Sequence, residues 1–109
     1  MRVWDVPPAE LCRKHLLGEH RELHGLWNII TQDKTGYSQH PETLRWVGKQ
    51  AALFRRHQDL VQEMHTRGYS HHTPLDDTLA TGDRNQHDLL QTLSEQREIL
   101  RDKPCDCYL

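Results

Sequence analysis

The sequence has no long apolar run and few cysteines. No stretch approaches the roughly 20 apolar residues that a membrane span needs, and the start, Met1-Arg2-Val3-Trp4-Asp5, lacks the apolar segment of a secretory signal. Only three cysteines occur, and Cys105 and Cys107 are too close in sequence to form an easy bridge. These absences exclude a disulfide framework and predict a soluble, cytoplasmic protein with no membrane contact.

A strong excess of charge of either sign is also absent, since the formal net charge is -2 at pH 7. Residues 1–72 carry ten Lys and Arg against eight Asp and Glu, whereas residues 73–109 carry four against eight. Eight of the nine histidines lie in the first part. The mildly basic first part permits nucleic-acid binding by one face but does not require it.

Strand patterns and repeats are missing, and helical periodicity takes their place. Apolar residues at spacings of three and four predict helices over about residues 9–30, 41–67 and 86–101. In the first of these, the buried stripe is predicted to comprise Leu16, His20, Leu23, Trp27 and Ile30. We expect an all-α fold: a single small domain over residues 1–109, of about three helices, with the N-terminal segment packed between them and an acidic part at 73–109.

Three ionisable side chains share a second stripe of the first predicted helix. His15, Glu19 and Glu22 are spaced by four and three residues, so at 100° per residue they lie on one side, next to the apolar stripe. At a boundary between core and solvent, partial burial would shift their pKa values and direct them at a ligand. The pattern alone favours the simpler interpretation, a solvated face with local ion pairs.

Metal binding is a further interpretation of the same residues, because His20 and His24 are also spaced like ligands. No HExxH motif occurs, however, and Cys105 and Cys107 have no second pair to complete a tetrahedral site. Glycine-rich phosphate loops and serine nucleophile motifs are absent too. We therefore expect no metal and no cofactor, and a metal-dependent hydrolase is the third interpretation.

Two segments of the chain resemble a known family. The run Glu10-Leu11-x-x-x-His15-Leu16-x-x-Glu19-x-Arg21-Glu22-Leu23 resembles the first helix of the phage pyrimidine-dimer DNA glycosylases, also called endonuclease V. Residues 49–69, which end in Arg67-Gly68-Tyr69, resemble the long middle helix of that family. The similarity is collinear over about residues 1–75 and implies a DNA repair enzyme.

The resemblance implies a bifunctional glycosylase and abasic-site lyase that acts on double-stranded DNA containing a damaged or modified base. In this family the α-amine of the mature N-terminal residue forms a Schiff base with the sugar, and a glutamate of the first helix assists. By position the glutamate is Glu22. The residues expected to contact DNA or the altered base are Arg2, His15, Arg21, Trp46, Lys49, His71 and His72.

Met1 is the expected nucleophile. Known members remove the initiator methionine and use the small residue that follows, but Arg2 is too large to favour this removal. The spacing from the terminus to the His15 and Glu22 pair is one residue shorter than in those members, so a retained Met1 would supply its amine at the right place. Because an α-amine ordinarily has a pKa of about 8, on the order of a tenth of this amine is neutral at pH 7.

The chain also departs from the family pattern. Gly25 stands where the family has another arginine, and residues 103–109 lack its aromatic, basic tail. Tyr37, His40 and Trp46, with His71 and His72, would offer another base pocket, although Trp46 fits a helix interface equally well. The alternative function is a non-catalytic helical module that binds DNA or protein. We expect a monomer in either case.

Overall fold

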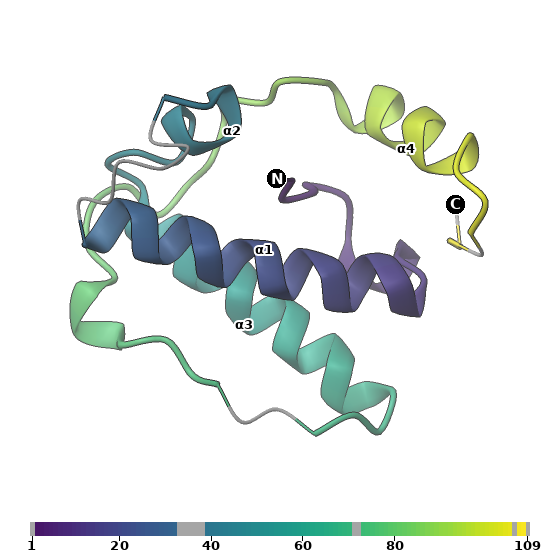
Figure 1. The fold of residues 1–109 in the computed structure, drawn as a ribbon, viewed down its shortest axis with the longest axis horizontal. Coiled ribbons are helices and arrows are strands. Elements are labelled where there is room, and N and C mark those ends of the chain that lie inside the picture. Colours follow the sequence, from purple (N-terminus) through teal and green to yellow (C-terminus); the bar gives the residue numbers. More distant parts are fainter. Residues whose placement is uncertain (1, 33–38, 71–72, 106, 109) are drawn as a thin grey trace.

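The computed structural model describes residues 2–32, 39–70, 73–105 and 107–108, and all regular structure in these ranges is helical (Figure 1). The α-helices are α1 (Arg13–Thr31), α2 (Pro41–Leu44), α3 (Gln50–Thr66) and α4 (Leu93–Arg101), with 3-10 turns η1 (Pro8–Glu10) and η2 (Asp77–Leu79). The all-α prediction is confirmed. No helix in the described ranges is both long and apolar enough to cross a membrane.

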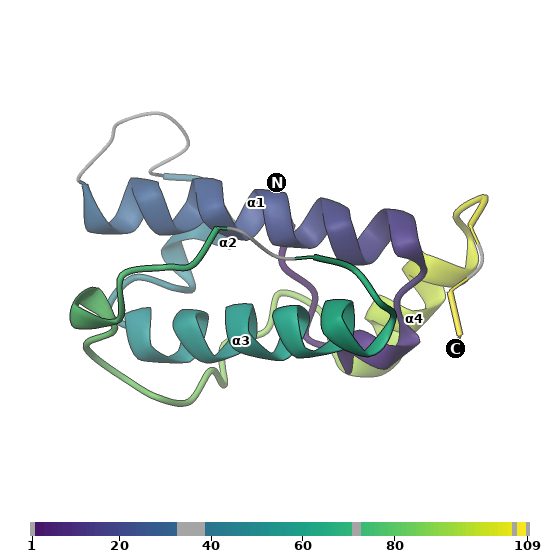
Figure 2. The ribbon, with the colours of Figure 1, turned by 90° about the horizontal axis from the view of Figure 1, so that it is seen from below.

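The core forms where α1 and α3 run antiparallel (Figure 2). Both helices turn an apolar stripe inward, and burying each large aliphatic side chain contributes about 1.5–3 kcal/mol. The buried apolar residues of this pair are Leu16, Leu23, Leu26, Trp27, Ala52, Leu53, Leu60 and Met64. Leu16, Leu23 and Trp27 of the predicted stripe are therefore confirmed as buried, while His20 and Ile30 are only half-buried.

The N-terminal segment crosses the interior of the molecule, as expected. Val3 and Val6 are fully buried, and Trp4 is nearly so. Figure 1 shows this segment passing between α1 and α4, on the side of the α1–α3 pair where α2 lies. An extended chain in this position has no strand beside it, so its backbone polar groups must bond to side chains.

The predicted helix over residues 41–67 is wrong in its first third. The chain leaves α2 after Leu44 and starts α3 at Gln50, because Gly48 adopts a φ of 77° that ends the helical path. Leu44 and Val47, which the periodicity assigns to the apolar face, are 49% and 57% exposed. The apolar spacing assumes one continuous helix, but the structure has no α-helix between Leu44 and Gln50, so the predicted apolar face does not exist there.

A loop that is distant in sequence caps the start of α3. The amides of Ala51 and Ala52 donate to the carbonyls of Thr81 (2.8 Å) and Asp83 (3.0 Å), and the amide of Asp83 donates to Gly48 (2.9 Å). These bonds bring Gly82 against the Gly48 backbone, where an added Cβ would lie 2.2 Å from the carbonyl oxygen. Gly48, a glycine inside a helical pattern, predicts that another part of the backbone packs closely against it. The structure shows this approach, but the residue with no room for a side chain is Gly82.

The helices at the two ends begin later than predicted. α1 starts at Arg13 rather than near Ala9, because residues 8–10 form η1 first. α4 starts at Leu93 rather than near Gln86, since Thr92 and Glu95 form a reciprocal capping box. Residues 86–91 are thereby left outside the helix, where Gln86 and Gln91 bond to other parts of the chain.

Candidate active site

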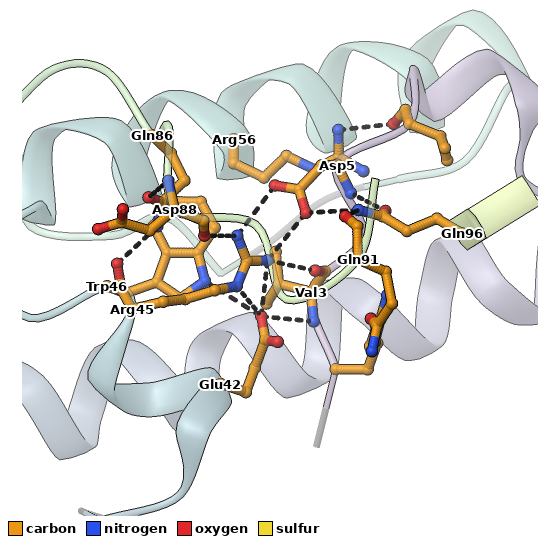
Figure 3. Close-up of polar contacts among 12 residues, drawn as sticks. Val3, Asp5, Glu42, Arg45, Trp46, Arg56, Gln86, Asp88, Gln91 and Gln96 are labelled. Atoms are coloured by element: carbon orange, nitrogen blue, oxygen red, sulfur yellow. Dashed lines mark hydrogen bonds and ion pairs between the residues drawn. The ribbon is translucent and has the colours of Figure 1, made fainter. Parts of the chain in front are cut away.

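A buried arginine holds the N-terminal segment on one side. Arg45 donates to the carbonyl of Val3 (Nη2–O 2.8 Å), pairs with Asp5 (Nη2–Oδ2 3.1 Å) and pairs with Glu42 (Nη2–Oε1 2.8 Å) (Figure 3). The Glu42 carboxylate also accepts from the amide of Val3 (3.4 Å). Gln96 of α4 completes the arrangement, because its side chain bonds to both the amide and the carboxylate of Asp5.

A second buried ion pair holds the segment from α1 and α3. Arg56 makes a bidentate contact with Glu19 (Nε–Oε2 2.7 Å and Nη2–Oε1 3.0 Å) and donates to the carbonyl of Val6 (2.8 Å). Burial raises the pKa of Glu19, and Arg56 together with the amide of Trp4 opposes that rise. Glu19 was predicted at the solvent boundary, but it is only 2% exposed. The N-terminal segment thus bonds to all four α-helices.

A cleft of about 280 Å³ opens beside this segment, between α1 and the C-terminal part of the chain. Its lining comprises Arg2, Trp4, Lys14, His15, Gly18, Glu19, Glu22 and Lys103. Three of the predicted site residues, Arg2, His15 and Glu22, therefore meet in one place. Glu22 is exposed there, whereas Glu19 is committed to Arg56.

Three cationic side chains and two carboxylates line the cleft. Lys14 and Lys103 flank His15, and Arg2 lies over the Trp4 ring at 4.3 Å. Burial, followed by the charges of Lys103 and Lys14, lowers the pKa of His15 and so favours its neutral imidazole. Such a lining favours an anionic ligand and leaves Glu22 as the one carboxylate of the lining without an ion-pair partner in the described part of the chain.

Arg2 is held in place at the edge of the cleft. Its Nη1 donates to Gln91 (2.6 Å), and burial lowers its pKa. The buried Nε has no hydrogen-bond partner among the described residues. Arg2 therefore places a positive charge at the edge of the cleft, next to the chain terminus.

Arg21 does not enter this cleft. It lines a neighbouring groove of about 750 Å³, together with Arg13, Leu17 and the C-terminal residues Pro104, Cys105 and Tyr108. Lys14 and Gly18 border both depressions. The two are therefore adjoining parts of one surface with exposed cations along α1.

Two of the residues expected to contact DNA make contacts within the protein. Trp46 is only 2% exposed and donates from Nε1 to Glu42 (3.2 Å), so the interpretation as a helix-interface residue is the correct one. Lys49 bonds to Gln86 (2.8 Å) and pairs with Asp88, which ties residues 86–88 to the start of α3. Neither residue lines the cleft.

Several expected residues lie outside the described ranges, namely Met1, Tyr37, His71 and His72. His40, which is also expected in the alternative base pocket, caps α2 by accepting from the amide of Glu42 (3.1 Å).

A family model for pyrimidine dimer DNA glycosylases matches residues 1–77. The chain belongs to this family. The match contains the cleft residues Arg2, His15 and Glu22, and it makes the chain a DNA glycosylase of the DNA repair class with a DNA substrate. Searches of curated proteins and of solved structures gave no significant match.

Sequence reasoning missed two features of this cleft. Lys103 lies outside the family match but reaches the cleft from the other end of the chain, and no local pattern indicates this position. Trp4 lines the cleft, and the Arg2 guanidinium lies over its ring. In the sequence, Trp4 is marked only as an aromatic residue in a short segment that also contains two valines.

Proposed function

We propose that the protein is a DNA glycosylase with abasic-site lyase activity and that the Met1 amine is its nucleophile. The family membership supports the glycosylase part, and the cleft supports the site, because Arg2, the residue next to Met1, lines it together with Glu22. The convergence of Arg2, His15 and Glu22 in one cationic cleft is the observation that carries the proposal.

The proposed reaction has two stages. The neutral Met1 amine attacks C1′ of the damaged nucleotide; a nitrogen–carbon bond forms as the glycosidic bond breaks, and the base leaves with a proton. Opening of the sugar ring gives an imine. Loss of the C2′ proton then expels the 3′ phosphate and nicks the strand, and water hydrolyses the imine to regenerate the amine.

Glu22 is the proposed acid–base group of both stages. It is exposed in the cleft, so it can exchange protons with the sugar and stabilise positive charge that develops there. Glu19 lies on the same stripe of α1, four residues after His15. It is unsuited to this role because Arg56 already binds both of its carboxylate oxygens. Arg2, Lys14 and Lys103 would contact the phosphates on either side of the flipped nucleotide.

Borohydride trapping tests this function. Incubation with a duplex that contains an abasic site, followed by reduction, should give a covalent protein–DNA adduct that peptide mapping assigns to Met1. A variant with a short N-terminal extension is the matched control, because it keeps the cleft and moves the amine; it should give no adduct. An adduct on a lysine, or one that the extension leaves unchanged, would contradict the mechanism.

A substrate panel then addresses the lesion. Glycosylase activity is measured on duplexes that carry a pyrimidine dimer or another altered base, with undamaged duplex as control. Base release from the dimer duplex would support dimer specificity. Binding to DNA with neither base release nor trapping would favour the non-catalytic module.

A further inference from the structure

All three cysteines of the chain gather around His15 at the N-terminal end of α1. The Nδ1 atom of His15 lies 3.2 Å from the Sγ of Cys12 and 3.3 Å from the Sγ of Cys107, and the Sγ atoms of Cys105 and Cys107 are 3.6 Å apart. All four potential ligand atoms lie within 4.8 Å of one another. We propose that Cys12, His15, Cys105 and Cys107 bind one structural zinc ion.

The spacing of these atoms matches the edges of a zinc tetrahedron. Zn–S bonds of about 2.3 Å and Zn–N bonds of about 2.0–2.1 Å place neighbouring ligand atoms about 3.6–3.8 Å apart. The three contacts above, at 3.2, 3.3 and 3.6 Å, are within a few tenths of an ångström of that range. In the sequence, Cys105 and Cys107 have no second ligand pair nearby. In the folded chain, Cys12 and His15 at the start of α1 supply that pair.

The surroundings suit a thiolate-rich centre. Burial raises the pKa of the Cys107 thiol, and the amide of Cys12, which donates to its Sγ (3.2 Å), opposes that rise. Cys12 itself is the N-cap of α1, where the helix dipole favours negative charge. Lys14 and Lys103 lie close enough to act on His15, so they offset the net negative charge of three thiolates around one Zn²⁺.

The centre would link the C-terminal segment to the cleft. Zinc bound at Nδ1 of His15 fixes the ring and leaves its other nitrogen for a ligand. The same ion would anchor residues 105–107 to α1 and so hold Lys103 at the cleft. This inference does not depend on the lyase mechanism, because zinc affinity is measured without DNA.

Metal analysis of the full chain tests the proposal. Protein purified without chelator and then dialysed should retain zinc at this site, and exchange with Co²⁺ should give thiolate-to-metal charge-transfer bands together with intense visible bands of a tetrahedral ion. The Cys105→Ser and Cys107→Ser variants should each lose the charge-transfer bands or shift them, with unchanged helix content by circular dichroism. A wild-type protein that binds Co²⁺ without such bands, or that carries a Cys–Cys disulfide by mass spectrometry after purification under reductant, would overturn the site.

A separate cluster of three histidines carries a second inference. His20 and His24 are one turn apart on α1 and face His57 of α3; the Nε2 of His24 lies 3.3 Å from that of His20 and 3.1 Å from that of His57. Zn–N bonds of about 2.05 Å in a tetrahedron place two nitrogens about 3.3 Å apart. The geometry points to a second divalent metal site, with these three imidazoles as ligands.

Two neighbouring features support a three-ligand site. His57 is fully buried, and its Nδ1 contacts the side-chain oxygen of Gln58 (2.9 Å), which is the outer hydrogen bond that metal-binding histidines usually make. An open depression of about 510 Å³ borders His20 and His24 and is also lined by Thr73. A metal here would therefore keep a coordination position that solvent or a ligand can reach.

The two sites are controls for each other. The wild-type chain should bind about two equivalents of Co²⁺, of which only one gives charge-transfer bands. His24→Gln should remove the other equivalent and leave those bands intact, whereas Cys105→Ser should lose or shift the bands and leave the histidine equivalent in place; His20→Gln is the second variant for the histidine site. Binding of a single equivalent that neither His24→Gln nor His20→Gln weakens would overturn the histidine site and leave the cysteine site standing.

Discussion

Glu22 and Glu19 lie one turn apart on α1 and border the same cleft, yet their surroundings give them different chemistry. Arg56 holds Glu19 as a buried ion partner, whereas Glu22 is exposed to whatever occupies the cleft. One carboxylate therefore contributes to structure and the other is available to exchange protons.

Replacement of Glu22 by Gln tests this division at the level of one residue. The amide keeps the size of the side chain but transfers no proton, so we expect strand cleavage to fall by about 10²–10⁴-fold while DNA binding persists. Cleavage is followed on abasic-site duplex, with Glu98→Gln on the exposed face of α4 as the matched control. Undiminished nicking would remove Glu22 from its assigned role.

Among the glycines that the structure describes, Gly82 has the least room for a side chain. Its φ is 84°, and an added Cβ would meet the Gly48 carbonyl at 2.2 Å. Gly82→Ala should therefore lower the free energy of unfolding by at least about 2 kcal/mol. Gly25→Ala in α1 is the control: its Cβ meets nothing within 4 Å, so it should raise stability by about 0.5–1 kcal/mol. Urea unfolding of both variants checks the contrast; equal effects would contradict the close packing.

At the scale of the elements, α1 and α3 are joined by an ion pair in the interior as well as by apolar packing. Arg56→Met leaves Glu19 buried without its partner, which should cost about 3–5 kcal/mol of stability at pH 8. Burial already raises the pKa of Glu19, and loss of Arg56 raises it further. The folded variant then binds a proton more readily than the unfolded chain, so its stability should recover as the pH falls from 8 toward 5.

Urea unfolding midpoints at pH 8 and pH 5 measure this recovery. The double variant Arg56→Met/Glu19→Gln is the control, because its residue at position 19 does not titrate, and it should lack the recovery. An equal penalty at both pH values would show that Glu19 is not the group responsible.

The sequence predicted the elements where local pattern and local packing agree. The apolar spacing of α1 and α3 reflects contacts within one or two helical turns, so it can be recognised in the sequence. The family resemblance then selected His15 and Glu22 on α1. The break at Gly48 was missed because residues 81–83 cap α3 from about 30 positions away. The burial of Glu19 was missed because its partner belongs to another helix, and Lys103 because it is separated from the rest of the cleft by most of the chain.

At the scale of the whole molecule, the net charge of -2 conceals a cationic surface along α1 and beside it. Because Lys103 lines the cleft, Lys103→Gln should reduce the slope of log K against log salt for duplex binding by about 0.9, the contribution of one phosphate contact. Lys49→Gln removes the same charge from a side chain engaged with Asp88 and should change the slope little. Fluorescence anisotropy at several salt concentrations measures both; equal slopes for the two variants would contradict the assignment.

The N-terminal segment also determines when the cleft exists. Asp5 bonds to Gln96, and Arg2 bonds to Gln91. During synthesis, Arg2 and Asp5 are made first, and about 90 further residues must follow before these partners exist. Contacts between such distant positions form late in folding. A nascent or truncated chain that lacks residues 91–96 should therefore be unable to fix its first residues beside Glu22, and it would present no assembled cleft to the DNA around it.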